Sequence, residues 1–170
     1  MQFRTKKIVL CAVLVALGIG LQIVESMLFV PINLPGGKLG LANIVTVILL
    51  YTLEEKSAIC CAVLRAFIGS VLYSGVTSAI YSVAGAIVAA VMMILAKRIA
   101  KGHFTHIGIS VIGAFFHNAA QVCVAAILLS NVWIFTYLPI LGIASSITGV
   151  FTGYAAKYAC RYLEKTFPAH

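Results

Sequence analysis

Six long apolar runs, separated by short polar segments, make up most of the chain. They predict helices at residues 8–30, 39–53, 56–73, 76–96, 106–129 and 132–160. The first run has 23 residues, and a helix of that length, about 34 Å, is long enough to cross a bilayer. The second has only 15 residues and follows a turn-forming segment at residues 31–38, so we expect it to be steep or partly broken. Pro139 interrupts the last run.

The composition places these helices in a membrane. The chain is 62% hydrophobic and only 9% charged, whereas ordinary globular proteins are about a quarter charged. A net charge of +8 would suggest nucleic acid as the partner of a soluble protein. Here the basic residues lie between apolar runs, so we predict no nucleic-acid partner. No gap is long enough for a soluble domain. We therefore predict one integral membrane domain over residues 1–170, an all-α bundle of six transmembrane helices.

The basic residues also predict the orientation of the bundle. With the N-terminus inside, ten of them fall on the inner side, and only Lys38 lies in an outer loop. The ten are Arg4, Lys6, Lys7, Lys56, Lys97, Arg98, Lys101, Lys157, Arg161 and Lys165. Cytoplasmic segments are enriched in lysine and arginine. We therefore expect both termini in the cytoplasm and the chain in a cell membrane, which it crosses several times.

Polar side chains within the apolar runs gather in the predicted outer half of the bundle. Ionisable groups inside a membrane are costly and normally face partners or a wet cavity. We predict a substrate-binding pocket formed by Glu25, Lys38, Asn43, Arg65, Ser78, Tyr81, His117, Asn118 and Gln121. Five of these should line a cavity open to the outside: Glu25, Arg65, His117, Asn118 and Gln121.

A purely structural role for the same residues is the alternative. Glu25 and Arg65 could form an ion pair that locks the first helix to the third. The three polar residues of the fifth helix could be interhelical hydrogen bonders, each worth about 0.6 kcal/mol. We favour the pocket for the set as a whole, because its members lie in one half of the bundle beside a glycine-rich loop.

Small residues recur every four positions on three helices, and such strips let helices approach closely. The strips are Ala12, Ala16 and Gly20; Ala58, Ala62 and Ala66; and Ser145, Gly149 and Gly153. Their usual partner is another helix of the same bundle.

Several motifs of catalysis are missing from the sequence. Gly36-Gly37-Lys38-Leu39 lacks the rest of a phosphate-binding loop, and a chain without aspartate has no Asp-rich magnesium–diphosphate site. Five cysteines form no C-x-x-C pair and are interpreted as small apolar residues. We therefore predict no catalytic residues, no metal site, no cofactor and no enzymatic activity.

Two features together resemble a known family. They are Ala12-x-x-x-Ala16 on the first helix and Pro35-Gly-Gly-Lys-Leu-Gly-Leu-Ala-Asn-Ile-Val-Thr46 at the start of the second. In a six-helix chain of 170 residues they resemble the Gx transporter family, which is similar to the substrate-binding S components of energy-coupling factor (ECF) transporters. Its members are often labelled heptaprenyl diphosphate synthase component I.

The resemblance implies a protein of the bacterial plasma membrane that binds a vitamin- or precursor-like molecule near its outer face. Its partners would be a membrane coupling protein and a pair of ATPases that drive uptake. The resemblance also implies that Ala12 and Ala16, with Gly20 on the same strip, dock onto the coupling protein. Residues 35–38 would help to close the site. The basic excess over Glu25 favours an anionic or polar ligand.

Two other functions stay open at this stage. The family label suggests a non-catalytic membrane subunit associated with heptaprenyl diphosphate or isoprenoid synthesis. A solitary proton-coupled transporter that uses Glu25, Arg65 and His117 is the second.

The orientation is directly testable by cysteine labelling. In a chain freed of its own cysteines, Gly37→Cys should react with a membrane-impermeant thiol reagent in intact cells, because the loop at residues 31–38 is expected outside. Labelling only after cell lysis would contradict the predicted orientation.

Overall fold

The computed structural model of the chain describes residues 2–28, 40–100 and 104–166. These residues form α-helices and one 3-10 helix, with no strand among them, so the predicted all-helical architecture is confirmed. The elements are α1 (Gln2–Leu28), α2 (Asn43–Thr52), α3 (Glu55–Tyr73), α4 (Gly75–Ile99), α5 (His106–Leu128), η1 (Val132–Tyr137) and α6 (Leu138–Thr166).

Five of the six α-helices are long and apolar enough to cross a membrane. The exception is α2, whose 10 residues extend only about 15 Å against a hydrocarbon core of about 30 Å. It is also shorter than the 15 residues expected from the sequence, because a turn at residues 41–42 precedes it. Six complete crossings and cytoplasmic termini stay predictions.

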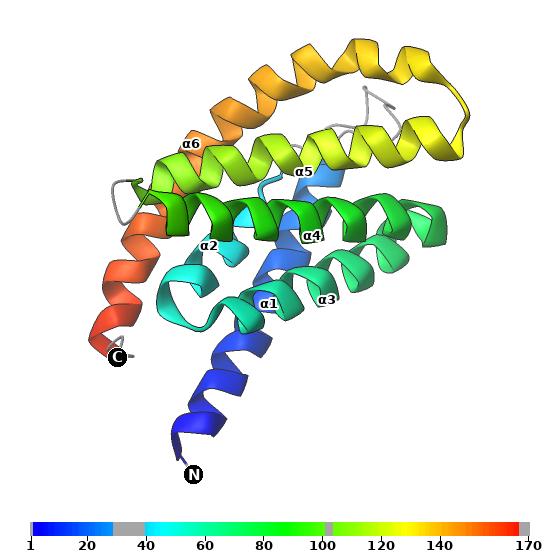
Figure 1. Cartoon of the computed structure of the whole chain (residues 1–170). Coiled ribbons are helices and arrows are strands. Elements are labelled where there is room, and N and C mark those ends of the chain that lie inside the picture. The colour runs from blue at the N-terminus through cyan, green and yellow to red at the C-terminus, as the bar shows by residue number, and fades with distance from the viewer. Residues whose placement is uncertain (1, 29–39, 101–103, 167–170) are drawn as a thin grey trace.

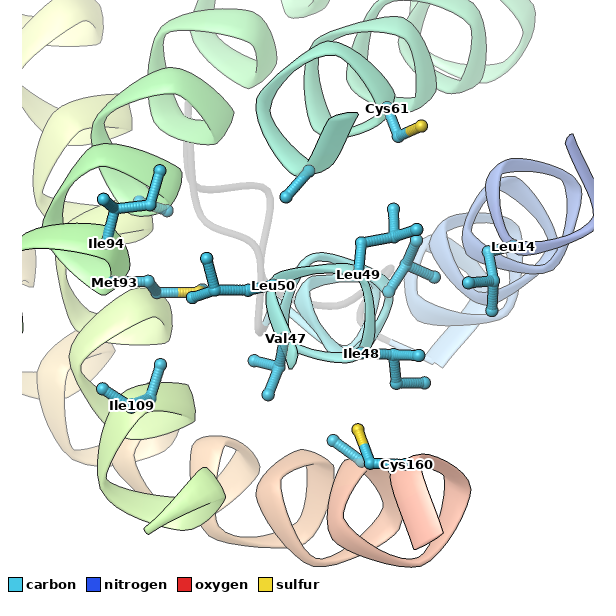
Figure 2. Close-up of a cluster of buried hydrophobic side chains, with 14 of the residues drawn as sticks. Leu14, Val47, Ile48, Leu49, Leu50, Cys61, Met93, Ile94, Ile109 and Cys160 are labelled. Atoms are coloured by element: carbon cyan, nitrogen blue, oxygen red, sulfur yellow. The ribbon is translucent and has the colours of Figure 1, made fainter. Parts of the chain in front are cut away.

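The short helix α2 is the core of the molecule. Eight of its ten residues are buried, and it packs against each of the five long helices. Figure 2 shows α2 almost end-on, with Val47, Ile48, Leu49 and Leu50 pointing outward in different directions toward the helices around it. An apolar helix of this length is more typical of a buried core than of a bilayer span.

The long helices form an arc around α2 in the order α1, α3, α4, α5, α6 (Figure 1). Consecutive members pack against one another, but among the described residues α1 and α6 do not pack together. These two are the edges of the arc, and only 28% of the apolar window of each is buried, against 39–56% for the three between them. The edge helices therefore present the largest apolar faces to lipid or to a partner.

The predicted interruption at Pro139 is a change of helix type. The 3-10 helix η1 ends at Tyr137, and α6 begins at Leu138, so Pro139 lies in the first turn of an α-helix. Proline is tolerated there because the first amide groups of a helix have no intrahelical acceptor. The last apolar run thus consists of two elements that meet one residue before the proline.

Polar contacts gather at one end of the bundle, which we call the basic end: the start of α1, the α2–α3 and α4–α5 connections and the end of α6. Lys7 Nζ donates to Glu54 at 2.8 Å, and this hydrogen bond holds the pKa of the exposed Glu54 carboxyl below its ordinary value. Arg98 Nε donates to Glu55 Oε1 at 3.1 Å. Both ends of the chain lie toward the lower left in Figure 1. Salt bridges therefore join α1 and α4 to the start of α3.

The three small-residue strips have different surroundings. The strips of α3 and α6 are buried inside the bundle, whereas all three residues of the α1 strip are exposed. A Cβ added to Gly153 would lie 2.5 Å from the Cα of Ile107 on α5, but one added to Gly20 would meet nothing within 4 Å. The strips of α3 and α6 are thus internal seams, and the α1 strip is an open surface.

This contrast predicts opposite effects of one chemical change. Gly153→Ala should lower the free energy of unfolding by about 1–3 kcal/mol, because the methyl group is forced against a backbone that cannot move aside cheaply. Gly20→Ala should leave stability unchanged or slightly higher, since alanine is the better helix former. Thermal unfolding of both variants in detergent provides the measurement. An equal loss in both would contradict an exposed α1 strip.

Candidate functional site

A small polar cavity lies in the half of the bundle opposite the basic end. Its walls come from α1, α2, α3, α4 and α5, together with the turn that precedes α2. The lining residues are Gln22, Glu25, Gly40, Ala42, Asn43, Arg65, Ala66, Ser82 and His117. Four residues of the predicted pocket, Glu25, Asn43, Arg65 and His117, are therefore brought together.

Glu25 fastens the end of α1 to the chain just ahead of α2. Its Oε1 accepts a hydrogen bond from the Gly40 amide at 2.8 Å, and its Oε2 accepts one from the Leu41 amide at 3.0 Å. Gly40 has φ +81°, and a Cβ on it would lie 2.9 Å from Asn43 Nδ2, so only glycine fits this turn. The carboxylate is 4% exposed, and its charge is stabilised by backbone donors.

Arg65 presents its guanidinium to the same cavity from α3. Its side chain is 3% exposed, and Nη1 donates to Gln22 Oε1 at 3.4 Å. Nε and Nη2 are buried without a hydrogen-bond acceptor among the described residues. Leaving a buried donor unsatisfied costs about 1–3 kcal/mol and more for a charged group. Such a group in a native structure calls for a functional explanation.

Glycines make room for the long polar side chains between the helices. A Cβ on Gly18 would lie 2.3 Å from Arg65 Cδ, and one on Gly69 would lie 2.8 Å from Gln22 Oε1. These two glycines allow α1 and α3 to enclose an arginine and a glutamine at their interface. On α4, a Cβ at Gly85 would lie 2.8 Å from Gln121 Cγ and 3.0 Å from the His117 carbonyl oxygen. The polar residues thus lie where a neighbouring helix has no side chain.

The other predicted pocket residues lie outside the cavity. Asn118 and Gln121 are buried on α5 but do not line it; Nε2 and Oε1 of Gln121 have no hydrogen-bond partner in the part of the chain described. Tyr81 packs in an apolar cluster with α5 and the start of α6, and Ser78 is half-buried. Lys38 lies outside the described residues.

Gln22 is the principal residue that the sequence analysis missed. It is buried, and its Nε2 donates to Ser70 Oγ at 3.0 Å while its Oε1 accepts from Arg65. A signal for it was present: Gln22 precedes Glu25 by three residues and therefore shares its helix face. The backbone donors of Gly40 and Leu41 carried no such signal, because any residue supplies an amide.

The cavity is far smaller than a site for a small organic molecule. Its volume of about 10 Å³ is about that needed for one water molecule, whereas ligand pockets usually have 300–1,000 Å³. Within the described part of the chain, no three histidine, cysteine, aspartate or glutamate residues gather as metal ligands. The lining places a guanidinium with spare donors beside a carboxylate that accepts hydrogen bonds from two amides.

The Glu25 contacts predict a large effect on stability. Glu25→Ala should lower the free energy of unfolding by about 2–4 kcal/mol, because it leaves two buried amides without their charged acceptor. Ser26→Ala is the matched control, since the Ser26 hydroxyl donates to the Ile23 carbonyl of its own helix, at 2.7 Å. Unfolding in detergent would measure both. Equal stability of the two variants would contradict the bracing role of Glu25.

Comparisons with known proteins give one match. No curated protein and no solved structure is similar to the chain. The sequence profile described as heptaprenyl diphosphate synthase component I matches residues 14–159, which include α2 through α5 and most of α1 and α6. The chain belongs to the heptaprenyl diphosphate synthase component I family.

Proposed function

We propose that the chain is the substrate-binding membrane component of an ECF-type transporter. In this role it takes up a small vitamin- or precursor-like molecule, together with a membrane coupling protein and a pair of ATPases. The observation that carries the proposal is Arg65, a buried arginine in the interior of a membrane bundle with two donors to spare.

The unused donors of Arg65 favour an anionic ligand. Arginine binds carboxylates and phosphates through two parallel hydrogen bonds, and Nε with Nη2 is one of the pairs that does so. Glu25 also lines the cavity, but both of its oxygens already accept backbone hydrogen bonds. An incoming anion is therefore the acceptor that would best satisfy Arg65. Since the cavity admits only about one water molecule, the surrounding elements must move apart to admit it.

The exposed α1 strip favours a docking surface for a partner helix. Ala12, Ala16 and Gly20 are all exposed on an edge helix, whereas the comparable strips of α3 and α6 are already occupied within the bundle. Helices in lipid associate mainly through close packing, which small residues permit. We propose this strip as the contact with the coupling protein.

The family description favours a second candidate. A heptaprenyl diphosphate synthase component I could be a non-catalytic membrane subunit that accompanies a soluble synthase. In either role we propose that the chain itself is not an enzyme, since it has no aspartate to hold the magnesium of a diphosphate substrate.

Purification of the protein with its ligand tests the ligand-binding part of the proposal. Protein isolated in mild detergent should carry a small anionic molecule detectable by mass spectrometry. Arg65→Gln should retain it about 10- to 100-fold less well, the expected loss for one or two bonds to a charged group. Arg65→Lys should fall between, because it keeps the charge but loses the paired geometry.

The proposed docking surface on α1 is tested with two neighbouring substitutions. Ala16→Trp should remove the co-purifying ATPases and uptake while leaving thermal stability and ligand retention intact. Leu17→Trp is the control, because this side chain is also exposed on α1 but points about 100° away from Ala16 around the helix. If Ala16→Trp unfolded the protein, the strip would be internal to the assembly of helices. A co-purifying soluble prenyl synthase in place of ATPases would favour the second candidate, the non-catalytic membrane subunit. Uptake by the protein alone in vesicles would favour a solitary transporter.

A further inference from the structure

The last turns of α6 form an aromatic and basic groove that the proposed function does not use. Tyr158, Arg161, Tyr162 and Lys165 line it, and its volume is about 560 Å³. It lies at the basic end of the bundle, on an edge helix, which Figure 1 shows in red toward the C-terminus.

The four side chains alternate as two cation–ring pairs. The Arg161 guanidinium carbon lies 5.9 Å from the centre of the Tyr158 ring, and Lys165 Nζ lies 5.9 Å from the centre of the Tyr162 ring. Such contacts hold a cation beside the ring while its other donors stay available. None of the four lining residues is acidic. The groove therefore combines two positive charges with two hydroxyl groups.

The same face of α6 is apolar further from the basic end. Ile143, Ile147, Phe151 and Tyr154 precede Tyr158 at intervals of three or four residues, which places all five on one side of the helix. All of them are exposed. From Ile143 to Lys165 the surface changes from aliphatic to aromatic and then to cationic, over about 33 Å, close to the full hydrocarbon thickness of a bilayer.

We propose that this groove binds the headgroup of an anionic phospholipid, whose acyl chains lie along the apolar part of the same face. Anionic lipids are concentrated in the cytoplasmic leaflet, and cations close to the membrane surface attract them. A free phosphate would use the cations but leave the apolar face without a role. A second copy of the chain would bring its own two cations against these two and be repelled.

The test measures lipid retention by native mass spectrometry of the full chain. The unmodified protein should bind phosphatidylglycerol in preference to phosphatidylcholine. Arg161→Gln with Lys165→Gln should weaken phosphatidylglycerol binding by about 10- to 30-fold, as expected for about fivefold from each cation near an anionic lipid. Arg4→Gln with Lys6→Gln is the matched control, because it removes the same charge from exposed positions of α1 at the same end. This control should change binding by less than about threefold.

Further arms separate the other occupants. The double variant Tyr158→Leu with Tyr162→Leu keeps both cations and should lose part of the phosphatidylglycerol binding. It replaces the variant without the two cations if that one does not fold. Equal weakening in the α1 control would overturn the proposal, since it would reduce the effect to net charge. Displacement of the lipid by inorganic phosphate at a similar concentration would overturn it in favour of a free anion. A dimer that dissociates in the α6 variant, with unchanged lipid preference, would overturn it in favour of contact between two copies.

Discussion

The burial of α2 is the constraint on which the rest of the structure depends. A helix of ten residues enclosed by five others has terminal amides and carbonyls that need partners from outside the helix. Glu25 accepts the amides of Gly40 and Leu41 just ahead of it, and Lys97 Nζ donates to the Leu50 carbonyl near its end, at 2.6 Å. A negative group at the start and a positive group at the end also match the helix dipole. Two charged side chains from other helices thus make the short helix compatible with the core.

The candidate site follows from this arrangement. Glu25 is held by the turn ahead of α2, and two donors of Arg65 on the facing helix have no acceptor among the described residues. Gly18 removes the side chain that would otherwise occupy the arginine's place. The bundle therefore has space for the Arg65 guanidinium in its interior. The unsatisfied donors of this group cost free energy that its contacts with other residues do not offset. This imbalance, more than the size of the cavity, makes the place the candidate site.

The sequence predicted the six helices with ends up to six residues from those of the structure, and four of the polar residues that line the cavity: Glu25, Asn43, Arg65 and His117. It did not predict the features that depend on which part of the chain lies opposite a given residue. The three small-residue strips have the same spacing, yet only the α1 strip is exposed, because it faces away from the bundle while the α6 strip faces α5. The hydrogen bonds that Glu25 accepts from two amides could not be predicted, because any residue supplies an amide. The 10-residue length of α2 follows from a glycine with φ +81°, a backbone state that one sequence does not reveal.

The two edges of the arc differ in chemistry, and the difference is consistent with the different neighbours proposed for them. The open side of α1 includes the strip Ala12, Ala16 and Gly20, where another backbone can come close, beside bulky exposed side chains such as Val13 and Leu17. The open face of α6 carries isoleucine, phenylalanine and tyrosine, which are bulky and would hold a second helix at a distance. A protein partner at α1 and lipid at α6 are therefore compatible in one assembly, because the described residues of the two helices do not pack together.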